Sequence, residues 1–398
     1  MNSRERVKAT INHREGDRIP LDNNGFVSGM HEIAYKNLIN FINFKDEIKI
    51  YDHVQRLAIV NDKIKNLLGV DTRYLYAKSG FNFAMKINGD GTFVDEFGAV
   101  FKNVGYYADN VKPPLKGMSF DEIKNYKLPD PKDISRFDNL DNESKSLYEN
   151  TDFSLWGGSC QTVFYLAWVL RGMEDFMADT SLDKKLSLYL IDMISEWVMQ
   201  WYEGFMSKVG KYIDVFWFAD DWGTQNGPLI SPDYFRKEIV PRLKKIISFI
   251  KTKTDAKCCY HTCGSTYWCL DDLIDAGVDI VHPLQVTAAG NDTKKIKLEY
   301  GKRLCFHGGT NNQGLFHKDI HLLSIDTLER IKDLAQGGGY VFSSGHNIQA
   351  NMPPENILRI FEIAREFGKY PLDVDGINKE IAKEKKELDE KKTYFMYL

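Results

Sequence analysis

The chain has 398 residues, of which 43% are hydrophobic and 27% charged, as in ordinary globular proteins. Its formal net charge of -4 gives no reason to expect nucleic acid or an anionic membrane as a partner. The N-terminus is charged, and no stretch approaches the roughly 18 apolar residues of a membrane span. Six cysteines without a regular framework fit reduced thiols, so we expect a cytoplasmic protein.

Short apolar runs alternate with amphipathic stretches along most of the chain, as in a series of strand–helix units. The predicted strands cover residues 18–26, 71–77, 152–158, 212–221, 256–261, 278–283, 303–309 and 339–346. The predicted helices cover residues 31–43, 53–68, 163–170 and 182–209, a stretch opened by Ser231-Pro232, and residues 267–275, 292–300, 325–335 and 353–368. Such a series folds as a doubly wound sheet or as a closed barrel. No GxGxxG follows the first strand, so we expect an α/β fold of the (β/α)8 TIM-barrel type.

We expect one barrel domain, residues 1–370, with a helical extension at its N-terminus. The pattern changes between residues 82 and 108, where apolar and polar residues alternate around Asn88-Gly89 and Phe97-Gly98. This alternation predicts a β-hairpin excursion from the mouth of the barrel. The charged residues 371–398 predict a helical tail, which we interpret as a solvated surface element.

Polar side chains recur where the predicted strands end, and in a barrel these C-terminal ends carry the chemistry. Five consecutive strands end with Asp220 and Asp221, with His261 and Cys263, with His282, with His307 and with His346. A lone histidine at a strand end is more often a hydrogen-bonded loop residue, and Asp221 could begin a turn. We give a structural interpretation to four other cysteines, Cys160, Cys258, Cys259 and Cys269.

His261 and Cys263 are less easily explained as structural residues, because imidazole and thiolate both bind zinc. An HxC pair supplies two ligands, whereas a catalytic zinc normally takes three from the protein and leaves one position open. The closure of a barrel brings its last strand back toward the others. His346, which follows the small residues of Ser343-Ser344-Gly345, is therefore our first choice for the third ligand.

Six segments in order carry a family resemblance: "NSRERVKATINHREGDRIP", "DDWGTQNGPLISPDYFRKEIVPRLKKI", "YHTCGS", "GVDIVHPLQVTAAGND", "FHGGTNNQ" and "GHNIQANMPPENI". They resemble the uroporphyrinogen decarboxylase superfamily, and the match runs nearly end to end, over residues 3–370. The resemblance implies a (β/α)8 barrel. It also implies one of two chemistries, since the true decarboxylases bind a tetrapyrrole without a metal. The corrinoid-dependent methyltransferases of the other branch hold zinc with an HxC pair and a later Cys or His.

The methyltransferase branch is the better match. Its later ligand falls in a "GC" or "GH" context, which corresponds here to Gly345-His346. The decarboxylases carry an arginine-rich segment after the first strand, suited to bidentate pairing with substrate carboxylates. This chain has no arginine between Arg18 and Arg56, which argues against a substrate with eight carboxylates. A histidine also occurs at the His346 position in the decarboxylases, so an acid role for His346, with Asp220 or Asp221 as the ligand, stays open.

The resemblance predicts a zinc-dependent methyltransferase that moves a methyl group from a small methylated substrate to the corrinoid (cobalamin) of a partner protein. No DxHxxG motif for cobalamin occurs in this chain, so the corrinoid must be supplied by that partner. A phenyl methyl ether, and thus O-demethylation, is favoured by aromatic residues near the strand ends: Trp156, Phe164, Tyr165, Trp217, Trp222, Phe306 and Phe316. A homodimer is left open.

The predicted site has three parts. His261, Cys263 and His346 hold the metal. Asp220, Asp221 or His346 transfers a proton, and the substrate lies among Trp156, Trp222, His282, His307 and Gln313. The alternatives are a methylcorrinoid-to-thiol methyltransferase, a metal-independent decarboxylase of a smaller acid, and a non-catalytic protein that binds corrinoids or methylated ligands.

Overall fold

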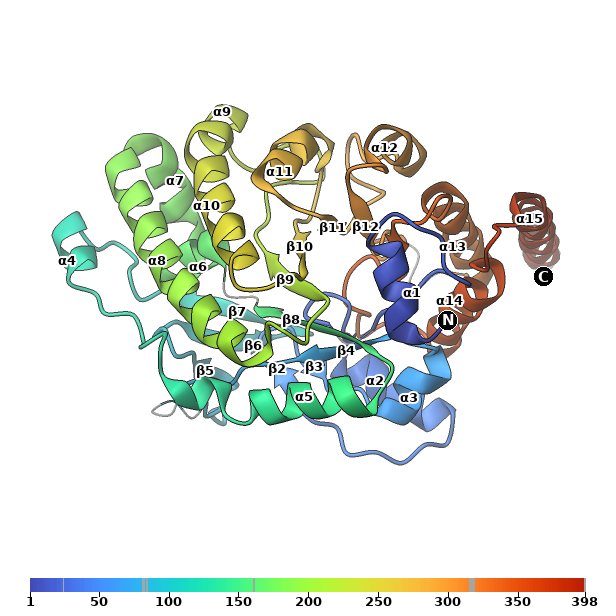
Figure 1. The fold of residues 1–398 in the computed structure, drawn as a ribbon, viewed down its shortest axis with the longest axis horizontal. Coiled ribbons are helices and arrows are strands. Elements are labelled where there is room, and N and C mark those ends of the chain that lie inside the picture. Colours follow the sequence, from blue (N-terminus) through green and yellow to red (C-terminus); the bar gives the residue numbers. More distant parts are fainter. Residues whose placement is uncertain (24, 81–82, 84, 160–161, 315–318, 397–398) are drawn as a thin grey trace.

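The computed structural model describes residues 1–23, 25–80, 83, 85–159, 162–314 and 319–396 (Figure 1). Within these residues, the centre is a seven-stranded sheet in which every neighbouring pair is parallel. Its order is β13 (Tyr340–Val341), β12 (Cys305–His307), β11 (Ile280–His282), β10 (Lys257–His261), β9 (Val215–Ala219), β8 (Ser154–Ser159) and β4 (Thr72–Leu75). Neighbours in the sheet follow one another along the chain, so the predicted α/β series of strand–helix units is confirmed.

The segment around Leu21 lies between the two edge strands and takes the eighth position of the predicted barrel. Leu21 forms a parallel bridge with Phe342, and Asp22 N donates to Phe342 O at 2.8 Å. On the other edge, Asp71 N donates to Leu21 O at 2.8 Å. Pro20 has no N–H to add to this ladder, so the segment forms single bridges in place of a regular strand. The result is a curled parallel sheet of the TIM-barrel kind.

Helices surround the sheet, as the ring of coiled ribbons in Figure 1 shows. Those that follow the strands are α6 (Val163–Arg171), α7 (Met173–Leu182), α8 (Lys184–Val209), α9 (Pro232–Tyr234), α10 (Val240–Lys251), α11 (Leu270–Ala276), α12 (Thr293–Tyr300), α13 (Ile320–Leu334) and α14 (Pro354–Phe367). The others are α1 (Ser3–Thr10), α2 (Glu32–Phe41), α3 (Asp62–Leu68), α4 (Phe120–Lys124), α5 (Leu140–Asn150) and α15 (Val374–Met396). Short 3-10 turns cover Ile134–Phe137 and Tyr267–Cys269, and a π-helical turn covers Phe235–Ile239.

Three predicted helices differ from the observed ones. The helix predicted at residues 325–335 begins five residues earlier, as α13. The single helix predicted at residues 182–209 is preceded by a second helix, α7, and begins only after Asp183, whose carboxylate caps α8 by accepting from Leu186 N. The helix predicted at residues 53–68 forms only as α3. Its first half contains β3 (Leu57–Ala58), which pairs with other strands and is therefore extended.

Two small antiparallel sheets lie outside the barrel. One joins β1 (Met30–His31), β3 and β2 (Ile50–Asp52), and the other joins β5 (Thr92–Val94), β6 (Val100–Val104) and β7 (Tyr107–Lys112). The second sheet is the predicted hairpin excursion, extended to residue 112. Asp95 forms the turn between β5 and β6, because its Oδ1 accepts from Phe97 N at 3.0 Å and from Ala99 N at 2.8 Å.

Buried apolar side chains form one layer between the sheet and the helices and a second inside the barrel. The second layer includes Val7 and Ile11, so the segment of α1 packs against the barrel interior. The predicted structural role of three cysteines is confirmed: Cys259 belongs to the inner layer, and Cys258 and Cys269 belong to the outer one. Cys160 lies outside the described residues.

The sequence predicted a solvated C-terminal helix, but the observed helix α15 is partly buried. It packs along α13, and Ile377, Ile381, Leu388 and Glu384 are buried on that side. Figure 1 shows α15 beside α13 at one end of the molecule. The helix is therefore amphipathic, with apolar residues on the face toward α13. None of the described helices is both long and apolar enough to cross a lipid bilayer.

Candidate metal centre

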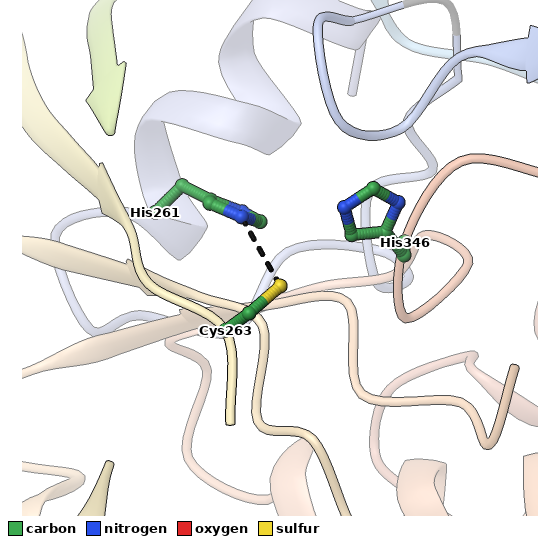
Figure 2. A group of neighbouring side chains, drawn as sticks. All are labelled: His261, Cys263 and His346. Atoms are coloured by element: carbon green, nitrogen blue, oxygen red, sulfur yellow. Dashed lines mark hydrogen bonds between the residues drawn. The ribbon is translucent and has the colours of Figure 1, made fainter. Parts of the chain in front are cut away.

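Three side chains that can bind a metal converge at the C-terminal ends of the strands (Figure 2). His261 ends β10, Cys263 follows two residues later, and His346 lies in the segment after β13. One ligand atom from each lies within 4.8 Å of the others, and Cys263 Sγ is 3.4 Å from His261 Nε2. Ligands of a tetrahedral zinc are roughly 3.5 Å apart, so the spacing and the donor types both fit such an ion.

The local sequence explains why these residues meet. Cys263 N donates to Asp221 Oδ1 at 2.8 Å, which holds the turn after β10 against the end of β9. His346 is brought in by Gly345, which lies so close to Thr310 that a Cβ on the glycine would be 2.0 Å from the carbonyl oxygen. Only a residue without a side chain permits this approach.

Hydrogen bonding orients the His261 ring. Its Nδ1 lies 2.8 Å from His282 Nδ1, while its Nε2 is on the side of Cys263 and of Asp221 Oδ1, 3.5 Å away. A bond between two imidazole nitrogens needs one N–H and one lone pair. When His261 supplies the N–H, its Nε2 keeps the lone pair that a metal needs.

Burial sets the protonation of the cluster. It lowers the pKa of His261 to about 3 and that of His346 to about 4, so both rings are neutral at pH 7 with a lone pair available. Burial and the neighbouring Asp221 carboxylate raise the pKa of the Cys263 thiol well above its usual range. The metal-free protein therefore holds a neutral thiol, and a divalent cation is the partner that favours the thiolate.

The two predicted aspartates differ in their surroundings. Asp220 Oδ1 accepts from Thr162 Oγ1, Phe164 N and Tyr165 N, each at 2.8 Å, and so caps the N-terminus of α6. Burial raises the pKa of Asp220 to about 7. Asp221 instead faces the cluster through the contacts given above, which makes it the aspartate beside the candidate metal ligands.

Four other predicted site residues are buried, Trp156, His282 and His307 inside the barrel and Trp222 between the sheet and the helices. His307 Nε2 is 2.9 Å from Asp22 Oδ2, and both side chains are fully buried. Trp156 packs against His307 with ring centroids 5.1 Å apart, and His282 stacks on His261 at 5.0 Å. Trp222 Nε1 donates to Tyr260 Oη at 2.8 Å. The substrate-binding roles of these residues stay predictions.

Two cavities reach the cluster. The first, about 430 Å³, includes in its lining Asp220, Asp221, His261, His346, Tyr165 and Trp217, together with Asp52, Asp95, Glu96, Phe83, Phe93, Phe97 and Phe101. The second, about 350 Å³, includes Cys263, His346, Gln55, Gln285, Asn312, Gln313, Asn347 and Gln349. Gln313 Oε1 accepts from Gln285 Nε2 at 3.0 Å and from Thr287 Oγ1. The cluster thus lies where an aromatic, acidic cavity and an amide-lined cavity meet.

The predicted aromatic set is only partly at the cavity. Tyr165 and Trp217 line the first cavity, whereas Trp156, Phe164, Trp222 and Phe306 are buried in the packed core. Phe316 lies outside the described residues. The cavity residues contributed by the small sheets were not among the predicted site residues. Three phenylalanines in the excursion, Phe93, Phe97 and Phe101, were a usable signal, because a solvated hairpin needs no such series.

A family model described as uroporphyrinogen decarboxylase (URO-D) matches residues 104–367, more than half of the chain. The chain belongs to the uroporphyrinogen decarboxylase family. The uroporphyrinogen decarboxylase of Coxiella burnetii is 24% identical over 157 residues, 39% of this chain and only 41% of that protein. The uroporphyrinogen decarboxylase of Chlorobium phaeovibrioides is 21% identical over 263 residues, 64% of this chain and 71% of that protein.

Among solved structures, a methyltransferase from Methanosarcina mazei has a similar fold. The TM-score is 0.65 at 18% sequence identity, over 92% of this chain and 99% of that chain. The fold shared with that methyltransferase extends over nearly all of the chain, including the part before the family match. The lining of the first cavity contains no Lys or Arg among the described residues, so this family member offers no cation there to a substrate carboxylate.

A second group of possible ligands lies far along the chain from the cluster. His321 Nδ1 is 2.6 Å from Glu384 Oε2 and 3.4 Å from Glu387 Oε2, between α13 and α15. Arg359 Nη2 lies 2.8 Å from Glu384 Oε1 and supplies the balancing charge. This group is an ion-pair network that fastens α15 to the barrel.

Proposed function

We propose that this chain is a zinc-dependent methyltransferase that moves a methyl group from a small methylated substrate to the corrinoid of a partner protein. The observation that carries the proposal is the cluster of two neutral imidazoles and one thiol at the end of a substrate-sized cavity. His261, Cys263 and His346 would hold the ion. A divalent metal there supplies Lewis acidity toward an oxygen or sulfur of the substrate.

The chain's own residues supply the remaining needs of the reaction. The first cavity binds the methyl donor and orients its methylated atom toward the cluster. Asp221, beside His261 and Cys263, is positioned to give a proton to the departing oxygen or sulfur. Asp220 fixes the start of α6 and with it the Tyr165 side of the cavity wall.

The second cavity is our candidate for the approach of the corrinoid partner. It shares His346 and Gln55 with the first cavity, so donor and acceptor can reach the same cluster from two openings. Its lining is rich in carboxamides, which both donate and accept hydrogen bonds. The rim of a corrin ring also bears carboxamides, so the two surfaces are complementary in hydrogen-bonding capacity.

The printed description of the Methanosarcina mazei protein as a methyltransferase supports the reaction class. The decarboxylase alternative is disfavoured by the cavity, since a carboxylate substrate would meet carboxyl groups and no Lys or Arg among the described residues. A thiol acceptor in place of a methyl donor would use the same cluster.

The test is methyl transfer to reduced cobalamin. The zinc-loaded protein is mixed with cob(I)alamin and, in turn, with methoxylated aromatics, methanol, methylthioethers and methylamines, and methylcobalamin is followed by its absorbance. We expect formation with a methoxylated aromatic and its loss after chelation, with recovery on adding zinc. Methylcobalamin formed at the same rate after complete removal of metal, or with none of the donors, would contradict the proposal.

A further inference from the structure

The first cavity carries negative charge that the protein does not balance. Two of its carboxyl groups come from the small antiparallel sheets: Asp52 ends β2, and Asp95 forms the turn between β5 and β6. Within the described part of the chain, neither carboxylate has a Lys or Arg at ion-pair distance. The next carboxyl group along this wall behaves differently, since Glu96 Oε2 lies 2.6 Å from Arg136 Nη2.

Both uncompensated carboxylates are held in place and retain acceptor capacity. Asp52 accepts from Gln55 N at 2.8 Å and from Gln55 Nε2 at 3.1 Å. Asp95 uses one oxygen, Oδ1, for the two backbone N–H groups of its turn. A carboxylate has room for about four hydrogen bonds, so each can still bind a ligand.

Burial without a cation affects both groups. It raises the pKa of Asp95 to about 6 and raises the pKa of Asp52 above its usual range. A positively charged ligand in the cavity would favour the ionised carboxylates and remove this cost.

The rest of the wall suits an organic cation. Phe93 and Phe101 stack with ring centroids 5.5 Å apart, and Phe97 lies in the same lining. Aromatic faces attract ammonium groups through their negative quadrupole, and the attraction grows where water is excluded. Trp217 adds an independent sign of a ligand, because its Nε1–H is buried and finds no acceptor among the described residues.

The position of the cation follows from the chemistry of the cluster. A metal bound there needs a lone pair on the methylated atom, and a quaternary nitrogen has none. We propose that the methyl donor is a bifunctional molecule whose methylated oxygen or sulfur faces the His261 cluster and whose separate ammonium group binds between Asp52 and Asp95. This inference rests on the proposed function and names its class of substrate.

Binding without turnover tests the inference directly. Tyramine and para-ethylphenol share a phenol ring, and only the first bears an ammonium group; para-hydroxyphenylpropionate replaces it by a carboxylate. We expect calorimetry on the zinc-loaded protein to give tyramine the tightest binding, roughly tenfold tighter than para-ethylphenol, and the carboxylate the weakest. Equal binding of tyramine and para-ethylphenol would overturn the inference.

Two variants locate the ammonium site. Asp95→Asn keeps the Oδ1 acceptor for the turn and removes the charge. Asp52→Asn keeps the Oδ1 acceptor for Gln55 N and removes the charge on β2. Each is expected to weaken tyramine binding about tenfold and to leave para-ethylphenol unchanged. Asp109→Asn, an exposed change on β7, is the matched control and should alter neither. If both cavity variants are folded by circular dichroism and bind tyramine as tightly as the natural protein, the proposed ammonium site is wrong.

Turnover separates this inference from the proposed function. The methyl ethers para-methoxyphenethylamine and para-ethylanisole are compared as donors to cob(I)alamin. A preference for the amine in both binding and kcat/KM supports both proposals. Amine-selective binding with no methyl transfer from any donor leaves the cation site standing and refutes the methyltransferase. Methyl transfer with no preference for the amine would support the methyltransferase and refute the cation site.

Discussion

The candidate metal cluster and the Asp52–Asp95 wall line the same cavity but are built by different kinds of structure. The cluster stands on the parallel sheet, where β10 pairs in register with its neighbours and His261 lies opposite Ala219 and His282. The wall comes from two small antiparallel sheets inserted between barrel elements. A regular sheet decides which residues meet at its edge, whereas an insertion can change its residues without disturbing that edge. On the two proposals, the reaction belongs to the barrel and the choice of substrate belongs to the insertions.

Cys263→Ala is expected to have the largest effect, and the effect should be confined to zinc binding and methyl transfer. Loss of one of three ligands should remove most of the bound zinc and lower methyl transfer by more than about hundredfold. Tyramine binding should persist, because the carboxylates of the wall are unchanged. Metal analysis by mass spectrometry and calorimetry measure the two outcomes, with Cys269→Ala as the control. Full zinc content in Cys263→Ala would show that the site is wrongly drawn.

Gly345→Ala tests how the last strand delivers His346. The added Cβ would lie 2.0 Å from Thr310 O, so the backbone must shift and His346 must move with it. We expect zinc affinity to fall by about tenfold to hundredfold in a chelator competition. Gly314→Ala meets no neighbour closer than 3.5 Å and is the matched control. Equal affinities of the two variants would contradict the role given to Gly345.

His282→Phe removes the partner of His261 Nδ1 and keeps a ring of similar size. The His261 ring then loses the hydrogen bond that fixes its tautomer and direction. Zinc affinity should fall about tenfold, because residues that hydrogen-bond to a metal ligand typically contribute about tenfold to hundredfold to metal affinity. The binding of tyramine should not change. An unaltered zinc affinity in a folded His282→Phe protein would mean that the contact does not orient the ligand.

Asp95→Asn should have the smallest effect, on stability, and only on the wall. The pKa of Asp95 in the folded protein, about 6, lies above its ordinary 3.8. Folding therefore favours the protonated form, and its contribution is lost as the pH rises through 6. The variant should melt about 1 to 3 °C higher than the natural protein at pH 8, and the gap should close toward pH 4. A lower melting temperature at pH 8 would contradict the assignment.

The parts of the protein that depend on regular periodicity were predictable from the sequence. The strand ends at His261 and His307 were located to the residue, and Cys263 and His346 converge as barrel geometry requires. The contributions of Asp52 and Asp95 were not predictable, because they depend on how two insertions pack over the barrel. The buried face of α15 escaped notice for a related reason, since its apolar residues are spaced among many charges and its partner α13 is distant in the sequence.

The central claim is that His261, Cys263 and His346 share one divalent ion, and X-ray absorption spectroscopy of the zinc-loaded protein tests it most directly. The account predicts one sulfur at about 2.3 Å and two imidazole nitrogens at about 2.1 Å from the zinc. Any zinc that remains bound to Cys263→Ala should show no sulfur ligand. A zinc shell of oxygen and nitrogen alone in the natural protein, or no stoichiometric zinc after loading, would contradict it.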